Sequence, residues 1–231
     1  MAGCSGYLIE HDGFRVLVDP GYATFLRLLE HCDAAAVDAV VVSHGHPDHC
    51  ADLSPLLRAR ALADRPAPPL PLHAPPGALR AVLALDRPGM LDDAFELREF
   101  VPGSAFAAGP FSVRTWLLPH WLPDAGLRLQ AGPAVLAYTG DTGPSPDLPA
   151  LAQDAGLLVA DASYPDRVPA DSARCLSSAR QAGQVAATAG VGQLMLAHLM
   201  PGTDPGAAVS AAAAGYDGAI TVASPGLEAS I

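Results

Sequence analysis

Lysine is absent from the 231 residues, and arginine supplies all 13 basic side chains. The formal net charge is −11. A protein that grips a long nucleic-acid backbone needs a basic surface, because phosphate contacts supply most of its affinity. The composition therefore argues against a nucleic-acid partner. It leaves room for a small phosphoester, which one or two arginines can hold.

Long apolar runs and paired cysteines are missing as well. No apolar run reaches the roughly 20 residues that span a bilayer, and the N-terminal stretch lacks the basic-then-apolar order of a signal peptide. The four cysteines form no CxxC pair, so we expect reduced thiols. Cys50 adjoins a group of histidines and is a candidate ligand, but we favour a small buried side chain there. These absences favour a soluble cytoplasmic protein without a membrane segment.

The composition predicts a substantial core. Hydrophobic residues make up 50% of the chain and charged residues 16%, which argues against disorder. We expect one domain over residues 1–231, because no segment is long enough to be a linker. Strands are expected at 6–10, 14–19, 37–43, 70–74, 95–103, 111–120, 126–141 (a hairpin), 156–164, 191–198 and 219–224. Helices are expected at 22–33, 50–63, 148–155, 177–190 and 204–216.

The order strand, acidic turn, helix, strand occurs in both halves of the chain. It is found in "FRVLVDPG" leading to "VDAVVVSH", and again in "AVLAYTGD" leading to "GLLVADASY". This weak repeat predicts an α/β fold with two similar sheets packed on each other and helices outside.

Polar side chains stand at the ends of six apolar strands. The residues are Asp19, His44, His120, Asp141, Asp161 and His198. Strand ends and their loops are where open α/β sheets build sites. Asp141 lies inside "YTGDTG", whose glycines allow the backbone to come close to a site.

The densest group is "SHGHPDHC", residues 43–50. In an extended loop His44 and His46 project to the same side, while Asp48 and His49 follow where the chain turns into a helix. Three imidazoles are seldom gathered so closely for packing, so we interpret the group as metal-binding. The other three histidines, His11, His31 and His73, are expected to be solvated or satisfied within the fold.

The candidate ligands are five imidazoles and two carboxylates, which exceed the four positions of a single zinc site. They suit two metals sharing a carboxylate. Nitrogen-rich ligation without thiolate favours zinc over magnesium or calcium, with manganese or iron as alternatives. Two metals about 3.5–4 Å apart clamp both the attacking and the leaving oxygen of a hydrolysis.

With these residues in place, the chain resembles the metallo-β-lactamase fold superfamily. "HGHPDH" matches its HxHxDH signature, and "LLPH", "YTGDTG", "LVADASY" and "LMLAHL" follow in order over nearly the whole chain. The resemblance implies a four-layer αβ/βα sandwich and a metal-bridging hydroxide as nucleophile. It assigns His44, His46 and His120 to one metal. It assigns Asp48, His49 and His198 to the other, with Asp141 bridging.

Within the superfamily, "GDTGP", "DASY" and the segment 178–199 resemble the ribonuclease Z-like branch. Asp161 then falls where that branch carries a proton-relay carboxylate, so it is predicted to be catalytic. The relay histidine is replaced by Leu176, beside Cys175, which argues against a poor leaving group such as a ribose hydroxyl. Asp48 is expected to double as the general base. Asp19 either orients a histidine or the bridging water, or is a structural turn residue.

Two further departures from this branch concern the ends of the fold. No Gly-rich basic arm for tRNA is visible, and the chain starts almost at "GYLIE", where the branch has a further strand. Either the sequence is truncated or this first edge strand is lost. The resemblance also implies a homodimer.

We expect a zinc-dependent phosphodiesterase for a small nucleotide-like substrate, such as a cyclic nucleotide. Three alternatives remain open from the sequence. One is a tRNA 3′-processing endonuclease, and another is a thioester, lactone or lactam hydrolase of the same fold. The last is a non-catalytic relative that uses metal only for folding.

Overall fold

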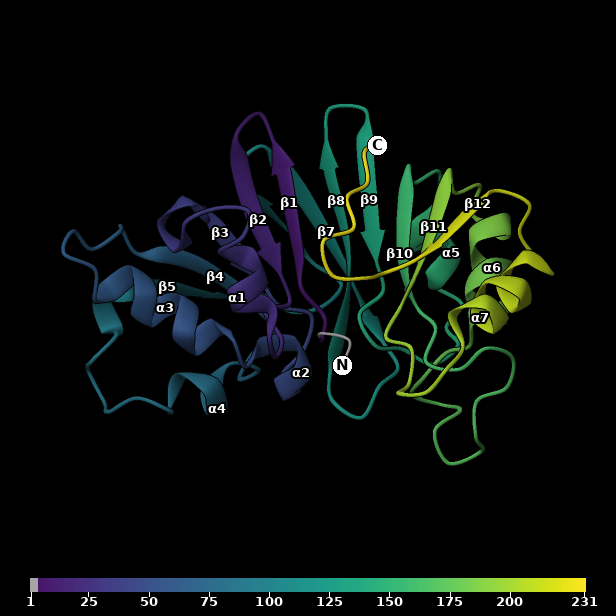
Figure 1. Ribbon diagram of the computed structural model, residues 1–231, viewed down its shortest axis with the longest axis horizontal. Helices are drawn as coiled ribbons and strands as arrows, with labels where there is room; N and C mark the ends of the chain where they lie inside the picture. The colour runs from purple at the N-terminus through teal and green to yellow at the C-terminus, as the bar shows by residue number, and fades with distance from the viewer. Residues whose placement is uncertain (1–3) are drawn as a thin grey trace. The chain divides into compact units, whose positions relative to one another are not determined.

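The computed structural model describes residues 4–231. The chain divides into two compact units (Figure 1). The first runs to Val101 and includes Ala107–Pro110, and the second comprises Pro102–Phe106 and Phe111–Ile231. A five-stranded sheet and a seven-stranded sheet organise them. That residues 1–231 act as one domain stays a prediction.

The first sheet has the strand order β1-β2-β3-β4-β5. Its strands are β1 Tyr7–His11, β2 Phe14–Val18, β3 Ala39–Val41, β4 Leu70–Ala74 and β5 Phe95–Glu99. The expected hairpin of β1 and β2 is present, with Asp12 at φ 50° and Gly13 at φ 80°. Two left-handed residues are what a tight two-residue hairpin needs. The other pairings are parallel, and β3 is buried along its whole length, as its run of valines predicts.

Short helices cover this sheet. They are α1 Thr24–Leu28, η1 Ala34–Ala36, α2 Pro47–Cys50, α3 Leu53–Ala61, α4 Arg80–Leu83 and η2 Asp92–Ala94. Leu53, Leu56 and Leu57 of α3 are fully buried in the core of this unit, at the spacing of one helix face. The expected helix over 22–33 is shorter, because only Leu28 in α1 is buried. The expected helix over 50–63 begins only at Leu53, after a separate turn of helix in α2.

The second sheet has the order β12-β11-β10-β9-β8-β7-β6. Its strands are β6 Ala105–Ala108, β7 Phe111–Leu118, β8 Asp124–Ala131, β9 Ala134–Tyr138, β10 Leu157–Asp161, β11 Gln193–Ala197 and β12 Ala219–Val222. Strands β7, β8 and β9 pair antiparallel, and β9 to β12 pair parallel. Buried and exposed residues alternate in β7, whereas β10 is buried throughout. Strand β6 was not predicted from the sequence.

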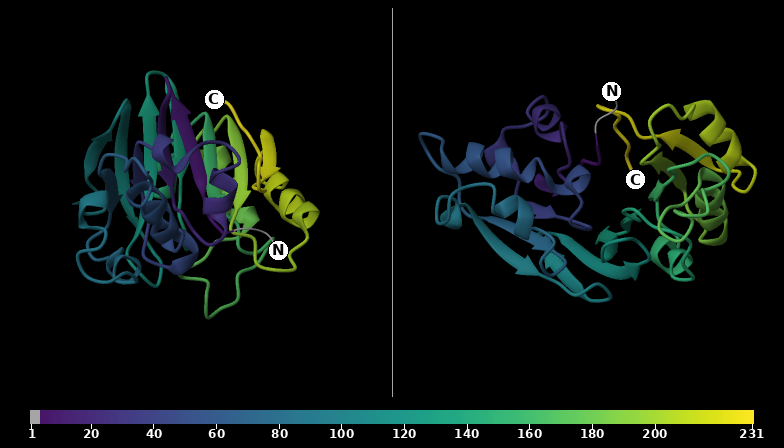
Figure 2. Two further views of the ribbon diagram at one scale, coloured as in Figure 1. Left: turned by 60° about the vertical axis from the view of Figure 1, so that its left-hand side comes forward. Right: turned by 90° about the horizontal axis from the view of Figure 1, so that it is seen from below.

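Three helices pack on the second sheet. They are α5 Leu148–Ala152, α6 Ala179–Thr188 and α7 Pro205–Ala213. Helices α6 and α7 run along one face of the sheet (Figure 2), and their alanines share its core. Ser178 begins α6 with a capping box, in which its side chain accepts from the Gln181 N–H. This helix layer leaves the strand ends open for polar side chains.

The remaining cysteines and histidines mostly follow the expectations. All four cysteines are free, and Cys50 is buried with its Sγ donating to the His46 carbonyl at 3.3 Å. Burial raises the pKa of the Cys50 thiol to about 11. His73 is buried in β4, where burial lowers the pKa of its imidazole to about 4. No helix within residues 4–231 is long and apolar enough to cross a membrane.

Candidate metal centre

The histidine group of the first unit stands at the carboxyl ends of two neighbouring parallel strands. Asp19 directly follows β2, and His44 follows β3. His46 precedes the first turn of α2, while Asp48 and His49 lie in that turn. The sequence therefore delivers these side chains to one edge of one sheet, because parallel strands end on the same side.

Asp19 hydrogen-bonds to several residues of this group. Its carboxylate is buried, accepts from the Ser43 N–H at 2.7 Å and from Ser43 Oγ at 2.6 Å, and lies 2.7 Å from His49 Nδ1. Ser43 Oγ in turn lies 3.0 Å from His44 Nδ1. One buried carboxylate thus fixes the Nδ1 side of two imidazoles. Such hydrogen bonds set the ring orientation of metal-binding histidines.

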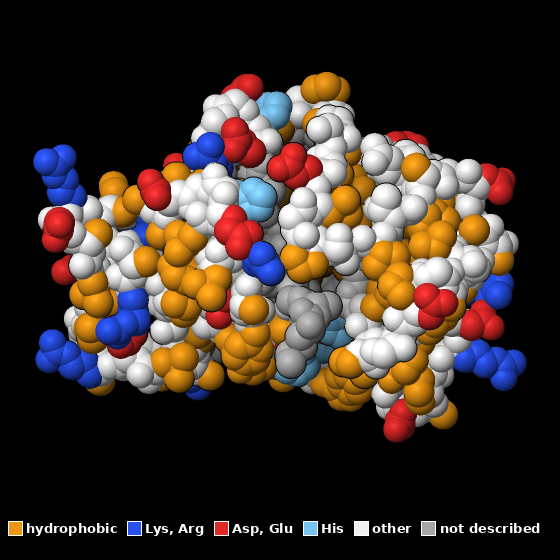
Figure 3. Space-filling view, in the orientation of Figure 1, with side chains coloured by type: hydrophobic (Ala, Val, Ile, Leu, Met, Phe, Trp, Pro, Cys, Tyr) orange, Lys and Arg blue, Asp and Glu red, His pale blue; other side chains and the backbone are white. Residues whose placement is uncertain are grey.

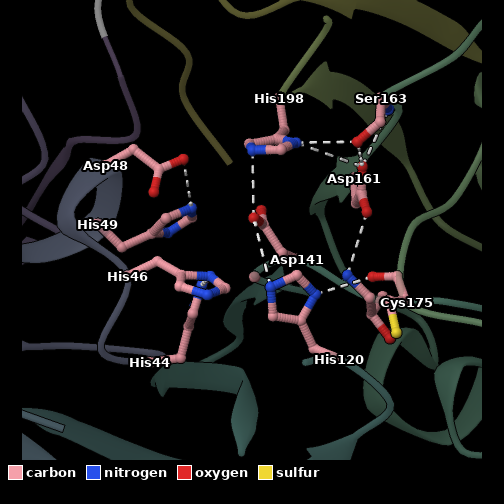
Figure 4. A network of polar contacts seen from close by, with 12 residues as sticks. His44, His46, Asp48, His49, His120, Asp141, Asp161, Ser163, Cys175 and His198 are labelled. Carbon is pink, nitrogen blue, oxygen red and sulfur yellow. Dashed lines mark hydrogen bonds and ion pairs between the residues drawn. The ribbon is translucent and has the colours of Figure 1, made fainter. Parts of the chain in front are cut away.

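The opposite sides of these rings converge. His44 Nε2 lies 2.9 Å from His46 Nδ1, and the His44 and His49 ring centroids are 4.2 Å apart. His49 Nε2 lies 3.8 Å from Asp48 Oδ2 (Figure 4). All four side chains offer ligand atoms suited to a metal ion. Cys50 contributes no thiolate, because its Sγ is turned to the His46 carbonyl.

Backbone strain accompanies this arrangement. Asp19 has φ 50°, a left-handed conformation that costs a residue with a side chain about 1–3 kcal/mol. Its three hydrogen bonds hold it there. Two residues on, any side chain at Gly21 would collide with the Asp48 carbonyl, so glycine is needed for this close approach. The "VDPG" segment is therefore shaped to support the histidine group.

The second unit gathers His120, Asp141 and His198 in the same way. His120 follows β7, Asp141 follows β9, and His198 directly follows β11. Asp141 Oδ2 lies 3.1 Å from His198 Nε2 and 4.0 Å from His120 Nε2 (Figure 4). The carboxylate oxygen thus stands between two imidazole nitrogens, and all three side chains are suited to hold a metal ion.

Asp161 lies behind His198. Its Oδ1 accepts from the Ser163 N–H at 2.9 Å and from Ser163 Oγ at 2.7 Å. Ser163 Oγ lies 2.9 Å from His198 Nδ1. The other oxygen accepts from the backbone N–H groups of Thr142 and Ser177, each at 3.1 Å. Asp161 therefore reaches His198 through a serine, with both of its oxygens engaged.

The surroundings of Asp161 raise the pKa of its carboxyl group. Burial raises the pKa of Asp161 to about 6, and the Asp141 carboxylate adds to the rise. His198, the Ser163 hydroxyl and the Thr142 N–H act in the opposite direction. The predicted proton-relay role of Asp161 stays a prediction. At the relay position itself, Leu176 is buried and offers no titratable group.

His120 is fixed by the backbone. Its Nδ1 donates to the Cys175 carbonyl at 2.8 Å, which turns Nε2 toward Asp141. The sequence reasoning missed this carbonyl and the two serines, Ser43 and Ser163. A signal was available for both serines, since Ser43 directly precedes His44 and Ser163 follows Asp161 at a strand end. A carbonyl acceptor leaves no such signal, because every residue has one.

The donor set fits divalent metal ions. His44, His49, His120 and His198 each have one ring nitrogen held by a carboxylate, serine or carbonyl, and the other turned to further ligand atoms. Seven ligand residues without a thiolate match nitrogen- and oxygen-preferring metals such as zinc, manganese or iron. That these seven residues are the ligands stays a prediction.

Comparisons with known proteins identify the family of this chain. Residues 14–199 match the family described as the beta-lactamase superfamily domain. The uncharacterized protein ML1173 of Mycobacterium leprae is 33% identical over 227 residues, covering 94% of this chain and 78% of that protein. A ribonuclease Z of Kineococcus radiotolerans is 33% identical over 246 residues, covering 84% of this chain and 77% of that protein.

A solved structure extends the likeness to three dimensions. The metallo-beta-lactamase fold protein YhfI from Bacillus subtilis has a TM-score of 0.88 and 26% identity, covering 97% of this chain and 91% of that chain. The expected metallo-β-lactamase fold, a mixed α/β fold with two sheets, is therefore confirmed. Its relatives include proteins named metallo-hydrolase and ribonuclease Z. The chain therefore belongs to the beta-lactamase superfamily, as one of its metallo-hydrolases.

Proposed function

We propose that this protein is a hydrolase with a dinuclear metal centre that cleaves a small phosphodiester. One observation carries the proposal. In both units, imidazoles are held at one nitrogen by buried hydrogen bonds while the other nitrogen faces further ligand atoms. Solvated or core histidines have no need of such orientation, whereas metal ligands do.

In this proposal His44, His46 and His120 hold one metal ion, and Asp48, His49 and His198 hold the other. Asp141 would serve both ions, in keeping with its position between His120 and His198. Zinc is the expected metal, with manganese or iron as alternatives. When bound, such ions lower the pKa of a water molecule and neutralise charge on the phosphoryl group.

Three aspartates of the chain are proposed to transfer protons or to orient the histidines. Asp48 is proposed as general base, which is supported by its position in the first turn of α2 and its 39% exposed side chain. Asp19 holds His49 directly and His44 through Ser43. Asp161 holds His198 through Ser163 and is proposed to steady that imidazole as charge develops.

A phosphodiester is favoured by the relatives named ribonuclease Z, and a small one by the charge of −11. On the face shown in Figure 3, the basic side chains are scattered singly. A tRNA 3′-processing endonuclease is the second candidate, supported by the name of those relatives alone. Gel-shift titration with tRNA at low and high salt separates the two, since retention at low salt is expected only of the endonuclease.

Leu176 is the reason to consider substrates other than phosphodiesters. A buried leucine there cannot protonate a leaving group, which favours a thioester, because a thiolate leaves without first being protonated. A lactone stays an alternative from the family resemblance alone. Rates on an aryl phosphodiester, a glutathione thioester and a lactone, measured on one preparation, rank these bonds directly. A homodimer is also proposed from the family resemblance, and light scattering checks it.

The main test uses metal-loaded protein and bis(p-nitrophenyl) phosphate. We expect hydrolysis that is lost in His46→Ala and in metal-stripped protein, and that returns to the wild type when zinc or manganese is added. His31→Ala is the matched control, because His31 is exposed and lies outside both histidine groups. If the wild type and His46→Ala behave identically, the proposal is wrong.

A further inference from the structure

His120 is flanked by an exposed aromatic ring. The Trp121 side chain follows it directly, with ring centroids 5.0 Å apart in an edge-on arrangement. Trp121 is 55% exposed. Leu117 and Leu122, four positions before and one position after Trp121 in the chain, are exposed as well. The indole therefore presents part of an apolar face to solvent beside a candidate metal ligand, where the base of a nucleotide could stack on it.

A second segment reaches the same histidine. Arg174 precedes Cys175, whose carbonyl accepts from His120 Nδ1 at 2.8 Å. Any side chain at Gly143, two residues after Asp141, would collide with the Arg174 carbonyl. The backbone of Arg174 is therefore held against two ligand-bearing segments of the second unit, those of His120 and Asp141.

The charge of Arg174 is available. Its side chain is exposed, and it forms no ion pair among residues 4–231, whereas Arg180 pairs with Asp166. A guanidinium is always protonated and matches phosphate oxygens with two parallel N–H donors. Arg167 offers a matched control in the same connecting segment between β10 and α6. It is exposed and without an ion pair in the described chain, yet it lies seven positions before Arg174.

We propose that Trp121 and Arg174 form a nucleotide-recognition subsite at His120. The indole stacks on the base, and the guanidinium pairs with phosphate oxygens. The inference deepens the proposed function by naming the side chains that would recognise a nucleotide substrate, and it rests on that function for its link to turnover. Neither side chain is assigned to metal binding or to proton transfer.

The ring and the charge predict separable effects on KM. Trp121→Ala should raise KM for a nucleotide phosphodiester about tenfold, since stacking on one base is worth about 1–3 kcal/mol. It should leave KM for an alkyl phosphodiester unchanged. Arg174→Ala should raise KM for both about tenfold, with partial rescue by Arg174→Lys. Arg167→Ala should match the wild type, and kcat should change little in each variant.

Binding to metal-free protein tests the subsite without turnover. The protein has two tryptophans, so Trp116→Phe leaves Trp121 as the sole indole reporter. Adenosine 5′-monophosphate should quench its fluorescence, and Arg174→Ala should weaken this binding about tenfold. Adenosine should bind equally with or without Arg174. Ribose 5-phosphate, which lacks the base, should bind equally with or without the Trp121 ring by calorimetry.

The outcomes separate the two claims. If the wild type cleaves no phosphodiester but binding of the monophosphate depends on Trp121 and Arg174, the subsite stands and the proposed function fails. If phosphodiesters are cleaved while both variants behave like Arg167→Ala, the subsite is wrong. Absence of any binding of the monophosphate by the wild type also overturns it.

Discussion

The two units hold their histidines with the same three residue types. In the first unit a buried Asp19 meets Ser43, and Ser43 meets His44 Nδ1. In the second, a buried Asp161 meets Ser163, and Ser163 meets His198 Nδ1. In each case the aspartate and the histidine stand at the ends of neighbouring parallel strands, Asp161 as the last residue of β10.

The difference lies in what else the aspartate holds. Asp19 also contacts His49, so one carboxylate orients two imidazoles. Asp161 uses its second oxygen for the backbone of Thr142 and Ser177. Those residues adjoin Asp141 and the Cys175–Leu176 segment. In the first unit the aspartate therefore binds a serine and an imidazole directly. In the second unit its second oxygen instead binds the backbone of the segments next to Asp141 and Cys175.

Replacing the two aspartates should have the largest effect on metal affinity. Asp19→Ala releases two histidines at once, and each such partner is worth about 10–100-fold, so affinity should fall roughly a thousandfold. Asp161→Ala releases one histidine and should cost about 10–100-fold. Competition with a fluorescent chelator measures both, and thermal melting of metal-free protein controls for folding. A larger loss in Asp161→Ala than in Asp19→Ala contradicts the comparison.

Lowering the pH should destabilise the fold through His73, a buried histidine that lies outside the two histidine groups. Burial lowers the pKa of His73 in the folded state to about 4, from an unfolded value of 6.5. Its neutral form therefore supports folding fully above pH 6.5, and this contribution is lost as pH falls toward 4. We expect a loss of about 3 kcal/mol between pH 7 and pH 4, measured by urea unfolding of metal-free protein.

The variant His73→Phe tests this assignment in the same buried strand. Its unfolding free energy should depend less on pH over that range, by about 3 kcal/mol. An unchanged pH dependence assigns the acid sensitivity of the fold to other groups, such as the histidines at the strand ends.

The serines should have matched, smaller effects. Ser43→Ala and Ser163→Ala each remove one link between a carboxylate and an imidazole, so each should weaken metal binding about tenfold. Ser→Thr at each position keeps the hydroxyl and should recover part of the loss. Ser43→Ala should add little in an Asp19→Ala background, because the carboxylate it serves is already gone. Unequal effects of the two serines weaken the parallel between the units.

The smallest effect concerns a residue of the second unit outside the ligand groups. Ser178 caps α6 and contacts Gln181, so Ser178→Ala should lower the unfolding free energy by about 1 kcal/mol. Metal affinity should not change. A drop in metal affinity here shows that general loosening of the second unit mimics the loss of a ligand partner.

Much of the fold could be predicted from the sequence because its signals are local. Runs of buried residues such as "VVV" in 40–42 and the Asp12–Gly13 turn indicate their own structure. Helix α1 is shorter than the helix predicted over 22–33, since Leu29 satisfies helical spacing while remaining exposed. Strand β6 was missed because "AFAA" carries little strand signal beyond one aromatic residue.

In the candidate site, too, only the features with a local sequence signal could be predicted. Ligand candidates can be recognised in the sequence as His or Asp at strand ends, and "HGHPDH" places four of them within six residues. The partners that orient them do not, because Ser43, Ser163 and the Cys175 carbonyl act through contacts between segments far apart in the chain. Asp19 and Asp161 look alike in the sequence, and only the geometry separates an aspartate that holds two histidines from one that holds loops.

Equilibrium dialysis of metal-stripped protein against zinc, with activity on bis(p-nitrophenyl) phosphate followed in parallel, tests the central claim most directly. The account predicts two zinc ions per chain, with hydrolysis appearing as they bind. It also predicts fewer bound ions in His44→Ala from the first unit and in His198→Ala from the second. Binding of one ion or none, or hydrolysis that is indifferent to zinc, would contradict it.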